Sequence, residues 1–476
     1  MLAGSIGRRG GIGMQDIDIG ELIEGGESET VEFKEAFEKE TIETVVAFAN
    51  TFGGTILIGV TDLGKTKHIT LGRRTIIAWA NQISQGTDPR IAPDVEPIMV
   101  RGKHIVIVRV KKSPVGAIST SGRCFRRVGC SNRRMTPYEI AELHLQSKGT
   151  SWDKLPAKDY RIEELDKQRV RSYIRKANEV GRRSIPAGQT LDQILKKLEF
   201  VEEGRPTWAG LLLFRKEPRK LSLSASMHCG RFKKEIIVVD DRMIEGPVLD
   251  QVEEAMDFVR KNTNVEFVMT GRPQREEVWD YPLDAVREAI INAIIHCDYS
   301  LPSLNEVRIY DDRLVVSSPG ELPMGMSLER LLGPHDSVPR NKGLAKAFYD
   351  LGLIEHWGGG IDKIVTECKD AGLPPPSFTE DYSFKVTFWK ETYAEPHLRA
   401  LGLNERQIKT IDHLKGIESL SNMGYQRLFD VSRRTSAREL DEMVTAGVLE
   451  RHGARGRSSN YRLRIRKKAE RIGLEQ

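Results

Sequence analysis

Residues Tyr281–Tyr299, YPLDAVREAIINAIIHCDY, are the stretch of this sequence that says most about the fold. Apolar side chains recur there at helical spacing, and Pro282 suits a first helical turn because its missing N–H would be unbonded there. Glu288, Asn292 and His296 are four residues apart, so a helix places them on one face. Such polar groups on an otherwise apolar helix are costly unless they bind something. The stretch predicts a helix with a ligand-binding face; the alternative is a polar stripe that faces water.

The residues that follow fit a nucleotide site. The run NEVRIYDDRLVVSSPG at 305–320 predicts a strand that ends in a glycine turn, and a Gly-rich loop then enters a second helix. A carboxylate can activate water, a carboxamide oxygen can hold Mg²⁺, and glycines let backbone N–H groups approach phosphate. We therefore predict a site for a nucleotide with Mg²⁺.

This layout resembles the ATP-binding domain of the GHKL family, which is shared by gyrases, heat-shock chaperones and histidine kinases. It is more closely similar to a divergent branch found in proteins described as RecG-like or as transcriptional regulators. The resemblance implies an ATP-binding α/β sandwich over residues 276–392, with Glu288 as general base and Asn292 as Mg²⁺ ligand. It also implies a phosphate-side loop of Gly358, Gly359 and Gly360. We assign these further residues to the cofactor site: His296, Pro319, Gly320, Arg340 and Asn341.

Composition limits the remaining choices. The chain has 476 residues, which predicts about three domains. Its formal net charge is only +5, so local clustering of charge decides whether nucleic acid is a partner.

Five scattered cysteines without a CxxC pair argue against zinc or disulfides and favour a reducing, cytoplasmic compartment. No apolar run of about 18 residues exists, so we expect no membrane partner. Residues 1–20 predict a disordered tail.

Residues 21–148 have the pattern of a mixed α/β domain with a basic rim. Positive charges gather near its end with few acids beside them, which favours phosphate contacts over a merely solvated surface. The rim residues are Lys111, Lys112, Arg123, Arg126, Arg127, Arg133 and Arg134.

Gly59–Thr66, GVTDLGKT, formally matches a P-loop. A P-loop opens directly into a helix, whereas the next residues, KHITLGRR, do not start one. We interpret residues 62–64 as a hairpin turn instead. A helicase is therefore the least favoured function, because a helicase motor needs many motifs and the chain has only this one.

The same segment resembles the Schlafen AlbA-type domain through ESETVEFK, AFANTFGG, ILIGVTD and FRRVG. Many prokaryotic relatives are regarded as DNA-binding regulators, whereas in some Schlafen proteins acidic residues bind a divalent metal and cut RNA. Carried over, that alternative places Glu27, Glu32 and Asp62 around Mg²⁺ or Mn²⁺ in an endoribonuclease acting on tRNA. The simpler interpretation is that Glu32 and Lys34 alternate on an exposed strand.

Residues 149–275 predict a connecting α/β segment without a catalytic constellation. Residues 398–468 predict a winged helix-turn-helix, in which Thr435 or Ser436 would cap the recognition helix. Arg433, Arg434 and Arg438 would lie near DNA, and Arg455 and Arg457 of the wing suit phosphate or the minor groove. Protein docking is the alternative use of such a domain.

The sequence thus predicts an α/β (α+β) multidomain protein with an AlbA-type domain, a GHKL-like sandwich and a winged helix. The favoured function is an ATP-binding, DNA-binding regulator, with RNA as an alternative partner. The sequence leaves a homo-oligomer open.

Overall fold

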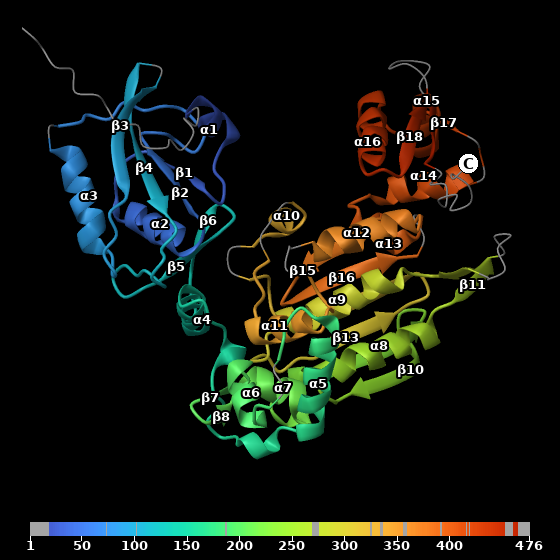
Figure 1. Ribbon diagram of the computed structural model, residues 1–476. Coiled ribbons are helices and arrows are strands. Elements are labelled where there is room, and N and C mark those ends of the chain that lie inside the picture. The colour runs from blue at the N-terminus through green and yellow to red at the C-terminus, as the bar shows by residue number, and fades with distance from the viewer. Residues whose placement is uncertain are drawn as a thin grey trace, which may run out of the picture. The chain divides into compact units, whose positions relative to one another are not determined.

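The computed structural model describes residues 19–72, 74–100, 102–185, 188–268, 276–323, 326–333, 337–355, 359–390, 393–415, 417, 419–452 and 460–464 (Figure 1). The chain divides into two compact units at Trp152/Asp153, which we call unit 1 and unit 2. Residues 1–18 of the expected disordered tail lie outside the described residues, and α1 begins at Ile19. Within the described ranges, every helix is too short or too polar to span a lipid bilayer.

Unit 1 contains a four-stranded sheet in the order β1-β2-β4-β3. The strands β1 and β2 are parallel because α2 crosses over between them, and the other pairs are antiparallel. A hairpin of β5 and β6 packs against α2. The strands are β1 Val31–Lys34, β2 Gly53–Ile58, β3 Asp94–Val100, β4 Lys103–Lys111, β5 Phe125–Val128 and β6 Ser131–Arg134. The helices are α1 Ile19–Gly25, α2 Lys39–Asn50, α3 Thr75–Gly86 and α4 Pro137–Ser147.

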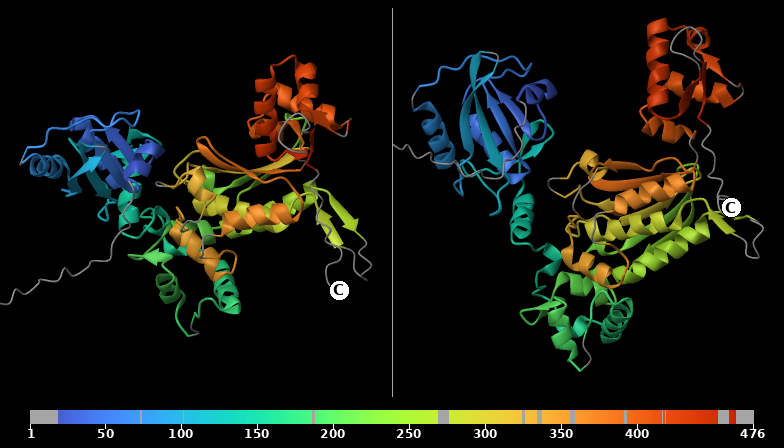
Figure 2. Two further views of the ribbon diagram at one scale, coloured as in Figure 1. Left: turned by 90° about the horizontal axis from the view of Figure 1, so that it is seen from above. Right: turned by 45° about the horizontal axis from the view of Figure 1, so that its top comes forward.

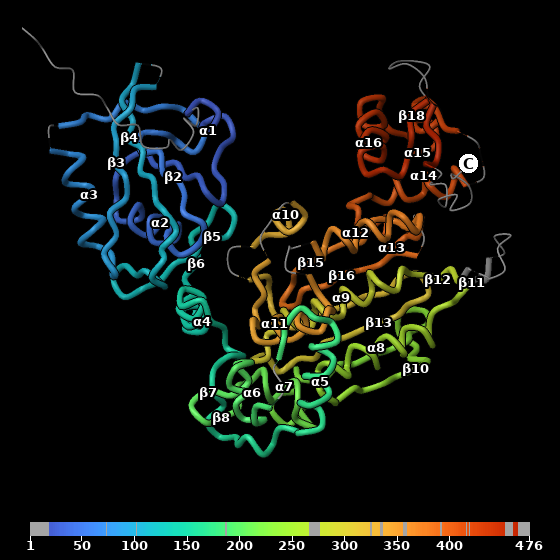
Figure 3. The backbone as a smooth tube through the Cα atoms, viewed as in Figure 1, coloured from blue at the N-terminus to red at the C-terminus, as the bar shows by residue number. Residues whose placement is uncertain are grey.

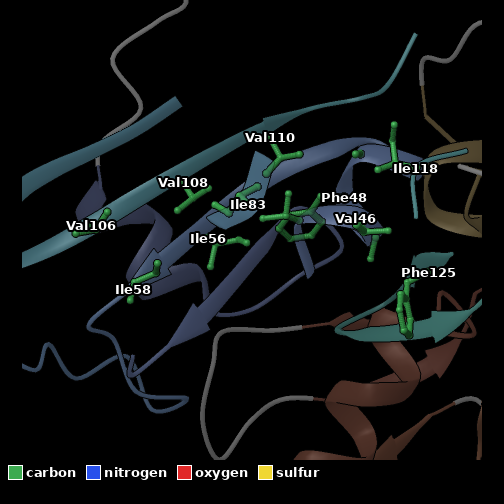
Figure 4. Close-up of a cluster of buried hydrophobic side chains, with 13 residues drawn as sticks. Val46, Phe48, Ile56, Ile58, Ile83, Val106, Val108, Val110, Ile118 and Phe125 are labelled. Atoms are coloured by element: carbon green, nitrogen blue, oxygen red, sulfur yellow. The ribbon is translucent and has the colours of Figure 1, made fainter. Parts of the chain in front are cut away.

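Both faces of this sheet are buried. Ile56 and Ile58 of β2 join Phe48 of α2 and Ile83 of α3 in one cluster, which Figure 4 shows in close-up. The alternate residue Leu57 joins a second cluster on the other face. Burial on both faces explains why ILIGV and IVIVRV are almost continuously apolar in sequence.

The P-loop lookalike forms the hairpin turn that we expected. Gly64 N–H donates to Thr61 O at 2.8 Å, and Val60 pairs with Thr66 in an antiparallel bridge. The next helix, α3, begins only at Thr75, so the turn does not open directly into a helix N-terminus as a P-loop does.

Unit 2 contains a six-stranded sheet in the order β10-β9-β13-β14-β16-β15, and α8, α9 and α12 lie side by side against it (Figures 1 and 2). Residues 305–320 form a hairpin, not one strand, because the chain turns between Tyr310 and Arg313. The strands are β9 Met227–Lys233, β10 Ile237–Ile244, β13 Asn305–Ile309, β14 Arg313–Pro319, β15 Ser377–Glu380 and β16 Ser383–Trp389. The helices are α8 Val248–Asn262, α9 Leu283–His296, α10 Leu328–Leu331, α11 Lys342–Asp350 and α12 Gly360–Asp370.

The expected connecting segment contributes to this sheet. Its β9 and β10 continue the sheet beyond β13, and β9 runs parallel to β13. The residues before β9 form a helical layer around Tyr173, Phe200 and Phe214, whose rings meet edge to face. The remaining elements are η1 Trp152–Lys154, η2 Ile162–Glu164, α5 Lys167–Val180, α6 Leu191–Lys197, β7 Val201–Glu202, β8 Arg205–Pro206, α7 Trp208–Phe214, η3 Pro218–Lys220, η4 Leu223–Ala225, β11 Val265–Val268 and β12 Glu276–Trp279.

The described residues of the C-terminal part form four helices and a three-stranded sheet in the order β17-β19-β18. Figure 3 traces the backbone of this part in orange to red. Ser432 caps α16, because its hydroxyl accepts from Thr435 N–H at 3.2 Å, so the helix begins earlier than Thr435 or Ser436 caps would allow. The elements are α13 Glu395–Ala400, α14 Glu405–Lys415, β17 Leu420–Ser421, α15 Asn422–Phe429, α16 Arg433–Thr445, β18 Leu449–His452 and β19 Asn460–Leu463.

Candidate functional site

A cavity of about 900 Å³ lies beside α9. The sheet strands β14 and β16, the helices α9 and α11 and the first turn of α12 line it. Glu288, Asn292 and His296 all line this cavity, as their four-residue spacing predicts. The apolar residues of α9 are packed against α8, α12 and β14, so Glu288, Asn292 and His296 are directed to the cavity. Arg287 lies on another side of the helix, where it pairs with Glu253 of α8.

Glu288 is a buried residue, only 9% exposed. Burial raises the pKa of this carboxyl above its ordinary value, and the charge of Glu355 adds to that effect. Lys363 and a hydrogen bond with the Asn292 side chain oppose the rise in pKa. A buried carboxylate with a raised pKa inside a cavity is suited to accept a proton from water.

Gly360 begins α12 directly over this pair. A Cβ atom at Gly360 would lie 2.5 Å from Glu288 Oε1 and 3.3 Å from Asn292 Nδ2, so only glycine permits this approach. Gly359 also lines the cavity, but a Cβ atom there would meet nothing within 4 Å. Gly358, the third residue of the expected phosphate loop, lies outside the described residues.

The turn after β14 forms another wall. Gly320 lines the cavity with φ of 101°, a conformation that favours glycine. Pro319 O accepts from Asp298 N–H at 2.9 Å, and Arg340 pairs with Asp298 at 2.9 Å. Arg340 also donates to Glu321 O at 2.7 Å, which ties the turn to the chain before α11.

Three of the residues assigned to the cofactor therefore have structural roles here. Pro319 and Arg340 hold the turn and are not among the residues that line the cavity. Asn341 is buried, and its side chain donates to Ile295 O at 2.9 Å and Cys297 O at 2.8 Å. Asn341 thus joins the start of α11 to the end of α9.

Sequence reasoning missed the charged residues that line the rest of the cavity. Lys342 and Lys346 of α11 stand four residues apart, a signal that could have identified them. Lys154 and Glu199 come from far along the chain, and no local pattern marks them.

The acids of the nuclease alternative are not brought together. Glu32 is buried and pairs with Arg127 at 2.6 Å and with Lys34. Glu27 accepts from Phe33 N–H at 3.0 Å, and Asp62 lies exposed in the hairpin turn. Across the described ranges of the chain, no group of three or more His, Cys, Asp or Glu is placed to hold a metal ion.

The basic rim is smaller than expected. Arg127 is buried over the Phe48 ring and is neutralised by Glu32, and Arg126 pairs with Glu139 at 2.7 Å. These two arginines are therefore not free phosphate contacts, contrary to the prediction. The rim residues that remain exposed are Lys111, Lys112, Arg123, Arg133 and Arg134.

The expected recognition helix is α16. Arg433 and Arg434 are exposed in its first turn, and Arg438 is exposed one turn later, 3.5 Å from Glu442. Arg455 and Arg457 of the expected wing lie outside the described residues.

Comparison with known proteins agrees with two parts of this description. Residues 27–136 match the family model described as "Schlafen, AlbA_2", and residues 305–388 match the one described as "Putative ATP-dependent DNA helicase recG C-terminal". The chain carries an AlbA_2 domain and a RecG-type HATPase-like domain. The predicted mixed α/β fold class with these two domains is thereby confirmed.

Two solved structures share weaker similarity with the chain. The crystal structure of the DIP2311 protein from Corynebacterium diphtheriae is 20% identical, covers 91% of this chain and 95% of its own, and has a TM-score of 0.40. The solution structure of the N-terminal domain of a RecG-related protein from Nitrosomonas europaea is 23% identical, covers 24% of this chain and 92% of its own, and has a TM-score of 0.19. No curated protein sequence matches the chain.

We predict that Glu32→Gln destabilises the AlbA_2 domain by about 3 kcal/mol, because it leaves the buried Arg127 charge without its carboxylate. Amide hydrogen exchange of β1 and β2 in the full chain measures this. Glu27→Gln is the control, since glutamine can still accept from Phe33 N–H. If the amides of β1 and β2 are equally protected from exchange in both variants, the Glu32–Arg127 ion pair does not stabilise these strands.

We predict that Gly360→Ala destabilises the packing of α12 on α9 by about 1–3 kcal/mol, because its Cβ atom overlaps the Glu288 carboxylate. Gly359→Ala is a matched control, with open space around the added atom. Hydrogen exchange of α9 and α12 compares the two variants. If both variants show the same fall in protection, steric overlap with Glu288 is not the cause.

Proposed function

We propose that the chain is a nucleic-acid-binding regulator, most simply a transcriptional regulator, whose state depends on ATP bound beside α9. The observation that carries the proposal is the approach of Gly360 to the Glu288–Asn292 pair in a cavity of about 900 Å³. Pockets of about 300–1,000 Å³ hold small ligands and cofactors, so the volume is sufficient. The family match at residues 305–388 supports an ATP-related role for this domain.

The residues present fit a magnesium ion that arrives with a nucleotide. Mg²⁺ is usually held by one or two protein oxygens together with phosphates and water. Asn292 offers a carboxamide oxygen for this, and the ion would supply charge neutralisation to the phosphates. Glu288 would orient or deprotonate a water molecule, and His296 would contact the nucleotide farther along α9.

Two surfaces support nucleic-acid binding. The AlbA_2 domain retains the five exposed basic residues of the rim, which lie at the end of β4, before β5 and on β6. We propose that the C-terminal part is a winged helix in which α16 is the recognition helix and the β18–β19 hairpin is the wing. Arg433 and Arg434 at the exposed start of α16 suit the major groove of duplex DNA.

The other activities lack comparable support. In the described residues, the Glu27, Glu32 and Asp62 side chains do not form a metal-binding group, so the structure gives no support to the endoribonuclease alternative. The hairpin turn at residues 62–64 removes the P-loop on which a helicase motor would depend.

We expect the full chain to bind ATP with Mg²⁺ in titration calorimetry. Asn292→Ala should weaken Mg²⁺-dependent binding at least tenfold, because the variant has no carboxamide oxygen for the ion. Glu288→Gln is the control: it keeps the shape of the cavity and should retain binding within a few-fold while abolishing any hydrolysis. Wild-type protein that binds no nucleotide, or Asn292→Ala with unchanged affinity, would contradict the proposal.

We expect affinity for duplex DNA to fall steeply with salt, because lysines and arginines displace condensed counterions. The double variant Arg433→Ala/Arg434→Ala should reduce the slope of log K against log salt by about 2, because each arginine that neutralises one phosphate adds about 1 to that slope. Arg399→Ala is the control, since Arg399 is paired with Glu395 and Glu405. A shallow slope in the wild type would argue against phosphate contacts altogether.

A further inference from the structure

Two lysines from distant parts of the chain meet on one carboxylate oxygen at the cavity wall. Lys154 Nζ and Lys346 Nζ each lie 2.9 Å from Glu199 Oε2. All three residues line the cavity that contains Glu288 and Asn292. Lys154 and Glu199 both lie outside residues 305–388, the part of unit 2 that matches the HATPase-like family.

We propose that Lys154 and Lys346 bind the phosphate groups of the nucleotide, and that Glu199 holds both lysines in place until phosphate oxygens replace its carboxylate. This inference rests on the proposed function, and it names the anionic part of the ligand as what these residues recognise. The ligand class is a nucleoside polyphosphate.

The two lysines have fixed positions relative to each other. Asp153, the neighbour of Lys154, is completely buried, and its Oδ2 accepts from Leu344 N–H at 2.8 Å in the first turn of α11. A Cβ atom at Gly343 would lie 2.9 Å from the same Asp153 oxygen, so glycine permits this contact. Lys346 follows on the same helix, so both lysines are anchored to α11.

The charges that line the cavity are consistent with such an exchange. The described lining residues include four lysines and four glutamates, Lys154, Lys342, Lys346, Lys363, Glu199, Glu288, Glu321 and Glu355. A polyphosphate needs an excess of cations, and the lysines held by Glu199 provide it once the phosphates displace that carboxylate. Removing the Glu199 charge should therefore strengthen polyphosphate binding, whereas removing either lysine should weaken it.

The charge and the backbone conformation of Glu199 agree with a carboxylate that holds two lysines. Burial alone would raise the pKa of its carboxyl, but hydrogen bonds from Lys154 and Lys346 lower the pKa below its ordinary value. Glu199 also has φ of 64°, at a position after α6 where glycine is usually preferred. Glu199→Gly therefore removes the carboxylate without imposing strain on the backbone.

Titration calorimetry of the full chain with ATP and with adenosine tests the inference. Lys154→Gln and Lys346→Gln should each weaken ATP binding about tenfold, the size expected for one charge-assisted hydrogen bond. Glu199→Gln and Glu199→Gly should strengthen ATP binding several-fold. All four variants should bind adenosine as the wild type does.

Lys261→Gln is the matched control, because Lys261 is also paired with a carboxylate, Asp240, but does not line the cavity. If the wild type binds ATP and the cavity lysine variants behave like this control, the lysine inference is wrong and the proposed function stands. If a lysine variant also fails to bind adenosine, the lysine supports the fold and does not recognise phosphate. A wild type that binds no nucleotide overturns the proposed function and this inference together.

Discussion

The close approach of Gly360 to the Glu288 carboxylate is the constraint on which the cavity beside α9 depends. The cost of removing the buried Glu288 carboxylate from water must be compensated, and here the charge of Lys363 and a hydrogen bond with the Asn292 carboxamide do so. The first turn of α12 can approach this close only because residue 360 has no side chain. The helices α9 and α12 thereby define one wall of the cavity.

Polar groups that do not line the cavity fix its other walls. Asn341 satisfies two carbonyl groups at the end of α9, and Asp153 satisfies an N–H group at the start of α11. These bonds are buried, so removing one partner leaves an unsatisfied group and costs about 1–3 kcal/mol. The position of α11 relative to α9 is consequently set by hydrogen bonds in addition to apolar packing.

The sequence predicted the side of α9 that faces the cavity, because helical spacing alone brings Glu288, Asn292 and His296 together. The sequence could not distinguish a polar residue that contacts a cofactor from one that stabilises the fold. Arg340 and Asn341 directly precede α11, and only the structure shows that their side chains donate to backbone carbonyl groups. Arg127 could have been identified, because strand alternation places it on the same side as the buried Phe125. Lys154 and Glu199 could not, since their pairing depends on tertiary structure.

The residues that line the cavity extend beyond the segment that matches the HATPase-like family model. Glu288 and Asn292 precede residue 305, and Lys154 and Glu199 precede it by more than a hundred positions along the chain. The strands β9 and β10 also complete the sheet that supports α9. A fragment that begins at residue 276 would therefore expose one side of β13 and lack two cavity residues.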